Sequence, residues 1–61
     1  MMLGIVTAST VKTIRVKDFT GSTHTFVHVV RIDDNITVGS RVQVKPISKS
    51  VVEVKLLDKE S

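Results

Sequence analysis

Apolar and polar residues alternate along most of this chain with a period of two, and no stretch carries the apolar stripe of a helix. Successive side chains of a β-strand point to opposite faces, so this alternation is typical of strands that bury one face. Arg41–Lys45 shows the pattern clearly, with Val42 and Val44 predicted to face inward between polar neighbours. Valine is the most frequent residue, and its branched side chain favours a pleated sheet.

Five segments follow this pattern, and turn-forming residues separate them. The predicted strands are Leu3–Ala8, Val11–Phe19, His24–Ile32, Arg41–Ile47 and Val51–Leu57. A turn at Asp18–Ser22 should place Gly21 at positive φ, which glycine adopts without strain. The segment Asp33–Ser40 is rich in turn formers and could hold one turn of helix capped by Asp34 or Asn35.

A chain of 61 residues has room for a single domain, which we take as residues 1–61. Its short strands must cover their edges, because unpaired edges promote aggregation. We therefore expect an all-β fold, a small five-stranded antiparallel barrel of the oligonucleotide-binding (OB) type, with an SH3-like barrel as the alternative. Pro46 lacks an N–H donor and should lie at a strand end or edge. The tail Asp58–Ser61 is expected to be frayed.

Charge and composition narrow the choice of partners. Nine Lys and Arg residues against six Asp and Glu residues leave a formal net charge of +3, which weakly indicates an anionic partner. The chain has no Cys, which excludes disulfides and thiolate metal sites. No apolar run approaches the roughly 20 residues that cross a bilayer. The first residues lack the pattern of a signal peptide, so we expect a cytoplasmic protein without membrane contact.

Short motifs along the chain resemble those of one family. Gly4–Val6 matches an opening Gly-x-Val, and Phe26–Val29 is similar to the ribonucleoprotein motif Phe-Val-His-Phe. Val38–Val42 resembles a Glu-Gly-x-x-Val strand entry, and Val52–Leu56 fits a closing strand. Together these residues make the chain resemble a shortened cold-shock domain. The resemblance implies a cold-shock-like OB barrel that binds single-stranded RNA or DNA in transcription or RNA regulation.

The family's aromatic platform is largely missing from this sequence. The family's strand-one Trp falls here on Ala8, and the last Phe of its second ribonucleoprotein motif falls on Val29. The two Phe of the first motif fall on Thr13 and Arg15, if two residues are deleted from the preceding turn. Phe26 and His28 stand at matching positions. Each base stacked on an aromatic side chain contributes about 1–3 kcal/mol, so we expect weak binding.

A candidate binding surface follows from pairing the second and third predicted strands. His24, Phe26 and His28 share one face of a continuous strand, and a hairpin would bring basic residues beside them. The predicted nucleic-acid-binding residues are Lys12, Thr13, Arg15, Lys17, Phe26, His28 and Arg31. The cations would neutralise phosphates while bases stack on the rings, so binding should weaken with salt. The alternative is that Phe26 is a core residue, because Val27 and Val29 make the opposite face equally apolar.

Other chemistry has little support, and we expect neither an enzyme nor a cofactor. His24 and His28 are four residues apart, about 13 Å along a strand, which is too far for one zinc ion. Asp33 and Asp34 are adjacent and are expected to begin a turn rather than to act as an acid and base. No arrangement of nucleophile, base and orienting group is evident.

A protein-binding module is the alternative function. A regulator or inhibitor that kept the barrel could bind a larger protein through apolar residues on the face opposite the presumed core. The candidates are Val11, Val30, Val51 and Leu57. Self-association into a homodimer is a related alternative, because a small core gains stability by burying more surface.

Overall fold

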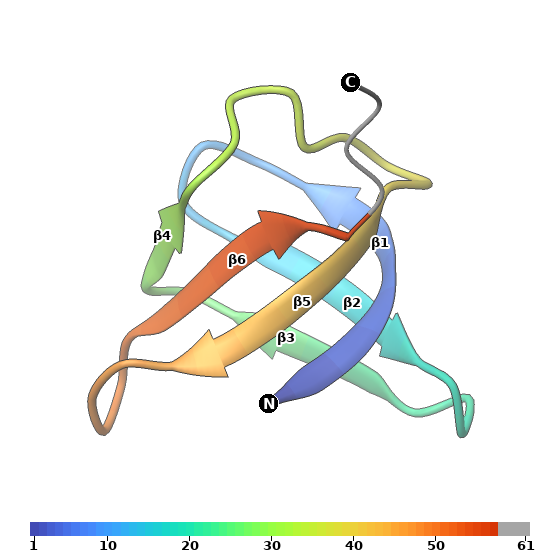
Figure 1. Ribbon diagram of the computed structural model, residues 1–61, viewed down its shortest axis with the longest axis horizontal. Coiled ribbons are helices and arrows are strands. Elements are labelled where there is room, and N and C mark those ends of the chain that lie inside the picture. The colour runs from blue at the N-terminus through green and yellow to red at the C-terminus, as the bar shows by residue number, and fades with distance from the viewer. Residues whose placement is uncertain (58–61) are drawn as a thin grey trace.

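The computed structural model describes residues 1–57 and is all-β, without a helix in that range (Figure 1). It contains six strands, in the order β1 (Met2–Ser9), β2 (Ile14–Asp18), β3 (Thr23–Phe26), β4 (Val29–Arg31), β5 (Arg41–Pro46) and β6 (Val52–Leu56). The expected tail at 58–61 lies outside the described residues. No helix among the described residues is long and apolar enough to cross a membrane.

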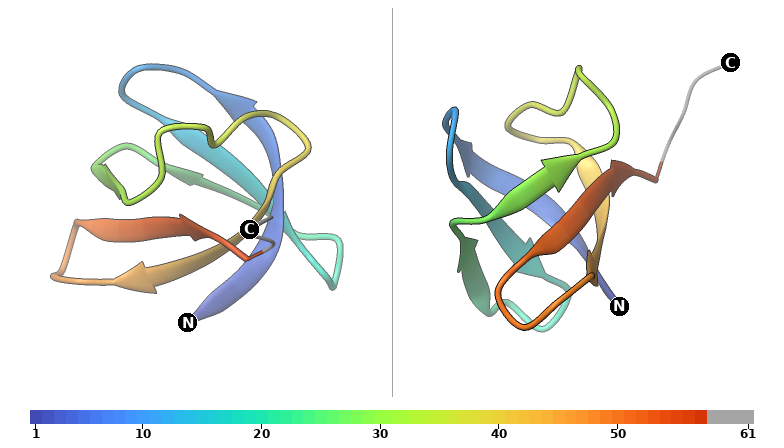
Figure 2. Two further views of the ribbon diagram at one scale, coloured as in Figure 1. Left: turned by 45° about the horizontal axis from the view of Figure 1, so that its top comes forward. Right: turned by 90° about the vertical axis from the view of Figure 1, so that its left-hand side faces the viewer.

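All six strands belong to one sheet, with the order β3-β2-β1-β5-β6-β4. Neighbouring strands are antiparallel except β4 and β6, which run parallel and side by side in the right-hand view of Figure 2. The sheet curls strongly, and its two end strands, β3 and β4, are consecutive in the chain. The expectation of five strands that are all antiparallel therefore needs correction on both points.

The extra strand arises because the predicted segment 24–32 is interrupted at Val27 and His28. Both of these side chains are exposed, whereas Phe26 before them and Val29 after them pack against the core. The alternation of inward and outward residues thus slips by one position at the break. Phe26 and Val29 are three residues apart, so in a continuous strand they would face opposite sides of the sheet. The break lets both pack against the same core.

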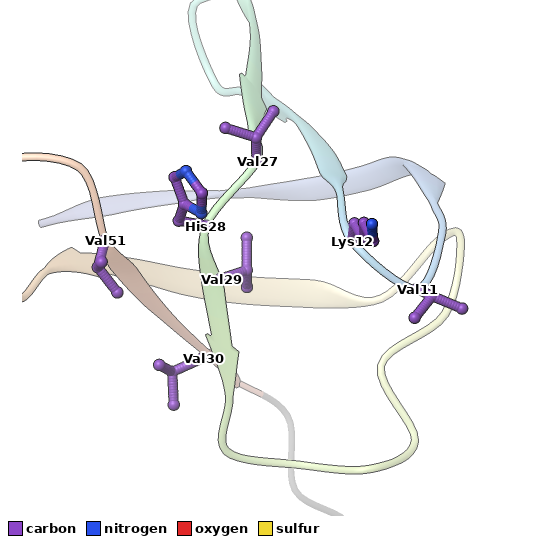
Figure 3. A pocket seen from close by; sticks show the side chains of 7 residues that line it. All are labelled: Val11, Lys12, Val27, His28, Val29, Val30 and Val51. Carbon is purple, nitrogen blue, oxygen red and sulfur yellow. The ribbon is translucent and has the colours of Figure 1, made fainter.

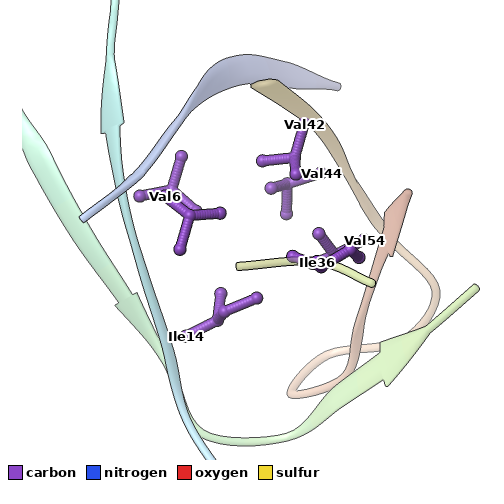
Figure 4. Packing of buried hydrophobic residues seen from close by; sticks show 7 residues of the cluster. Val6, Ile14, Ile36, Val42, Val44 and Val54 are labelled. Carbon is purple, nitrogen blue, oxygen red and sulfur yellow. The ribbon is translucent and has the colours of Figure 1, made fainter. Parts of the chain in front are cut away.

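The core is a compact aliphatic cluster inside the curled sheet. Its buried members are Val6, Ile14, Val16, Ile36, Val42, Val44 and Val54 (Figure 4). The inward positions predicted for Val42, Val44 and Val54 are confirmed. β-Branched side chains at alternate positions pack densely between pleated strands. The apolar residues that produce the period-two pattern are therefore the ones that form the core.

The connection between β4 and β5 contributes a core residue without forming a helix. Ile36, only 5% exposed, inserts from this loop into the cluster. Backbone hydrogen bonds from Gly39 N to Val6 O (2.8 Å) and from Val6 N to Ser40 O (3.0 Å) fix the end of the loop to β1. The predicted turn of helix is therefore wrong, because the loop meets its backbone hydrogen-bonding needs partly through β1.

Two turn and strand-end predictions are confirmed. Gly21 has φ +92°, in the left-handed region that favours glycine. Pro46 is the last residue of β5, where the missing N–H does not interrupt the ladder. Gly4 does not lie in a turn. It is inside β1, which is paired on both sides, with β2 and with β5.

Candidate functional site

The predicted binding surface is divided between the two faces of the sheet. In the β2–β3 ladder Phe26 stands opposite Ile14, and His24 stands opposite Val16. Directly opposite residues of an antiparallel pair share a face, so both rings lie on the interior side with two fully buried residues. The rings of His24 and Phe26 are stacked, with centroids 6.4 Å apart. Phe26 is therefore a half-buried residue packed against the core.

Arg15 and Lys17 lie on the outer face of β2, opposite Thr25 and Thr23. The prediction that Arg15 and Phe26 form one surface is therefore wrong. A solvent-facing ring would have left the interior near Ile14 without a partner, and the guanidinium could not replace it there without a large desolvation cost. Among the alternatives left open by the sequence, the one with Phe26 in the core is the arrangement found.

The side chain of Arg31 forms hydrogen bonds within the fold. Its guanidinium donates hydrogen bonds to Ser9 Oγ at 3.2 Å, to Thr13 O at 3.1 Å and to Thr10 O. Thr10 and Thr13 are also joined to each other, with 2.7 Å between their hydroxyl oxygens. Arg31 thereby fastens β4 to the turn between β1 and β2, and Thr13 belongs to the same cluster. Arg31 was predicted to bind phosphate and Thr13 to belong to the nucleic-acid-binding surface; here the two residues bond to each other within the fold.

The β2–β3 turn is organised around one carboxylate. Asp18 Oδ1 accepts hydrogen bonds from Thr20 Oγ1 (2.6 Å), Thr20 N (2.9 Å) and Ser22 N (3.0 Å). His24 Nε2 lies 2.7 Å from Asp18 Oδ2 and must be the donor there, since an ionised carboxylate only accepts. The Thr20 hydroxyl first, then His24 and the backbone amides of Ser22 and Thr20, hold the pKa of Asp18 well below its usual range.

These contacts predict a specific response to acid. A carboxyl whose pKa is lower in the folded chain than in the unfolded chain stabilises the fold above about pH 4, and this contribution is lost as pH falls further. Asp18→Asn should therefore unfold at lower urea concentration near neutral pH and show a shallower loss of stability in acid. Urea midpoints measured from neutral pH to about pH 3 test this.

Asp34→Asn, in the exposed loop before β5, is the control and should keep the acid dependence of the natural chain. An unchanged acid slope in Asp18→Asn would show that the turn contacts do not control stability.

The outer face of the sheet carries most of the strand cations. Across the described strands its outward positions include five basic residues, namely Arg15, Lys17, Arg41, Lys45 and Lys55, and a single carboxylate. That carboxylate, Glu53, stands opposite Lys45 in the β5–β6 ladder. Lys17, Ile5 and Arg41 form one row across three neighbouring strands. The sheet therefore presents a predominantly positive exterior.

Phe19 is a ring that the sequence analysis did not single out. It follows Lys17 by two residues, in the turn after β2, and its surface is 70% exposed. The signal was present in the alternation Arg15, Lys17, Phe19, which continues the outward series into the turn.

A groove lies beside the break between β3 and β4 (Figure 3). It has a volume of about 480 Å³ and is lined by Val11, Lys12, Val27, His28, Val29, Val30 and Val51. Three of the four apolar residues predicted to be exposed for protein binding, all except Leu57, line this groove. Lys12 and His28, which were predicted to bind nucleic acid, lie here and are both exposed.

Comparisons with protein-family models, with curated proteins and with solved structures found no match for this chain.

Proposed function

We propose that this chain is a small non-catalytic binding module that binds single-stranded nucleic acid weakly through the outer side of β2. We take its fold as an OB-like barrel in which β3 and β4 together correspond to the third strand of the barrel. The support is the strand order: if β3 and β4 count as one interrupted strand, the order becomes a closed cycle.

The observation that carries the functional proposal is the series Arg15, Lys17 and Phe19. The two cations lie about 7 Å apart along the outer face of β2, and the exposed ring follows in the turn. A positive track with a neighbouring aromatic ring is the general arrangement that binds single strands, since phosphates contact the cations while a base stacks. The mechanism thus keeps the predicted roles of Arg15 and Lys17 and replaces Phe26 and His28 with Phe19.

Weak and sequence-tolerant binding follows from the small number of rings. The chain has two Phe residues and no Trp or Tyr, and Phe26 packs against the core. One stacked base contributes about 1–3 kcal/mol, so most of the affinity must come from phosphate contacts. Affinity of this kind falls with ionic strength because bound counterions are released.

The test is a fluorescence-anisotropy titration of labelled oligothymidine and oligouridine over a range of salt concentrations. The double variant Arg15→Gln and Lys17→Gln should bind about tenfold more weakly at low salt. If two phosphate contacts are lost, the slope of log affinity against log salt should shrink by about 1.4, at about 0.7 for each contact with a single strand. Phe19→Ala should weaken binding at least about fivefold without changing that slope.

The matched control removes the same charge elsewhere, with Lys45→Gln and Lys49→Gln in β5 and the loop after it. It should lower affinity about twofold at most, because only the overall field of the protein changes. Equal losses in the two double variants, or binding that does not depend on salt, would contradict the proposed site.

A further inference from the structure

The groove beside the β3–β4 break borders a strand edge without a strand partner. Backbone hydrogen bonds run from Val52 N to His28 O and from Ile32 N to Val54 O, both at 3.0 Å. Backbone groups of alternate residues point to the same edge, so those of Val29 and Arg31 point away from β6. Among the described residues β4 pairs with β6 alone. Its other edge faces the β1–β2 turn, where Figure 3 places Val11 and Lys12.

The side chains around this edge are strongly apolar. Five of the seven lining residues are valines, and Val11, Val27 and Val30 are 95%, 58% and 45% exposed. Exposed valines in one concave site on so small a chain indicate a surface that a partner covers. An unpaired strand edge beside apolar side chains is the arrangement that accepts an added peptide strand.

The charge of the groove indicates the kind of peptide. Lys12 and His28 are its polar side chains, and none of its lining residues is acidic. Glu53 stands opposite Val30 in the β4–β6 ladder, but its other cross-strand neighbour is Lys45. Charge complementarity therefore favours a peptide that carries carboxylates.

The size of the groove argues against a second copy of this chain as the occupant. A stable dimer buries about 800 Å² on each partner through about 20–30 residues. That area would be roughly a fifth of the total surface of 4315 Å², whereas seven residues line the groove. β4 itself is only three residues long, so its edge matches a short extended segment.

We propose that this groove binds a short extended segment of a protein partner, in which aliphatic and acidic residues alternate, as an added strand on β4. The valines hold the aliphatic side chains, the free backbone groups of β4 supply hydrogen bonds, and Lys12 contacts a carboxylate. This site is separate from the outer side of β2 and does not depend on nucleic-acid binding.

The test is an amide-shift titration with an acetylated and amidated peptide of alternating valine and glutamate, up to about 5 mM. We expect a Kd of about 1 mM, with shifts concentrated at residues 11–12 and 27–31. A peptide of alternating valine and lysine should bind at least about fivefold more weakly. Lys12→Glu should reverse this preference, whereas Lys49→Glu, in the β5–β6 loop, should keep it.

Three results would overturn the proposal. One is no saturable shift with the acidic peptide, and another is equal shifts with both peptides. The third is concentration-dependent shifts of the groove in the free protein, which would identify a second copy as the occupant. The peptide titration repeated on the Arg15→Gln and Lys17→Gln double variant should keep the preference for the acidic peptide, because neither residue lines the groove. Failure at one surface is therefore distinguishable from failure at the other.

Discussion

Gly4→Ala should lower the free energy of unfolding by about 3 kcal/mol or more. A Cβ atom at this position would lie 2.6 Å from the backbone oxygen of Lys17 and 2.6 Å from Val16 Cγ1. β1 is paired on both sides, so it cannot move away from β2 without disturbing β5. Overpacking typically costs about 1–3 kcal/mol, and contact with backbone places this case at about 3 kcal/mol or more.

That cost is a large share of the total stability expected for a domain of this size. At about 0.05–0.15 kcal/mol per residue, a chain of 61 residues is stable by only about 3–9 kcal/mol. Urea denaturation followed by far-ultraviolet circular dichroism measures the change. Gly21→Ala is the matched control, because no atom lies within 4 Å of its added Cβ and the cost is the positive φ alone. We expect about 1 kcal/mol for that control. Equal losses in the two variants would show that the β1–β2 spacing is not limiting.

Ile14→Ala should be the most damaging of the simple core truncations. Ile14 is fully buried, begins β2 and points into the cluster formed with Val6 and Val54 (Figure 4). Truncation of a buried isoleucine to alanine costs about 2–5 kcal/mol, because apolar contacts are lost and a cavity is left. The upper part of that range would exceed the stability of many domains of this size.

The measurement is the urea midpoint of Ile14→Ala relative to the natural chain. Val38→Ala, which truncates a valine that is 63% exposed in the loop before β5, is the control. It should change the free energy of unfolding by about 0.5 kcal/mol at most. A small effect at Ile14 would mean that the curled sheet does not enclose the core described above.

Much of the strand architecture was predictable from the sequence. The strand predicted at Arg41–Ile47 is β5, observed at Arg41–Pro46, and the segment Val51–Leu57 contains β6. Here a polar residue alternates with each valine, so only one register buries the apolar side chains. The segment Val11–Phe19 was predicted too long, since β2 begins at Ile14 and the preceding residues form the turn that Arg31 holds.

The candidate site was less predictable than the strands. In Phe26–Val30 apolar residues occupy both sequence parities, so periodicity alone could not assign a face. The role of Arg31 depended on a contact with Thr13, 18 residues earlier, which no local pattern encodes. The groove required the β1–β2 turn, the β3–β4 break and Val51 to come together from three separate parts of the chain.

For this protein, the sequence by itself determined that the chain is all-β, where the clearest strands lie and which valines of β5 and β6 face inward. These features depend on side-chain alternation over a few neighbouring residues. Only the tertiary structure decided that Phe26 turns inward, that the third predicted strand breaks, and that Arg31 is used within the fold. Those outcomes depend on which distant surfaces meet, because the gain from filling a shared interior outweighs the local preference of any single residue.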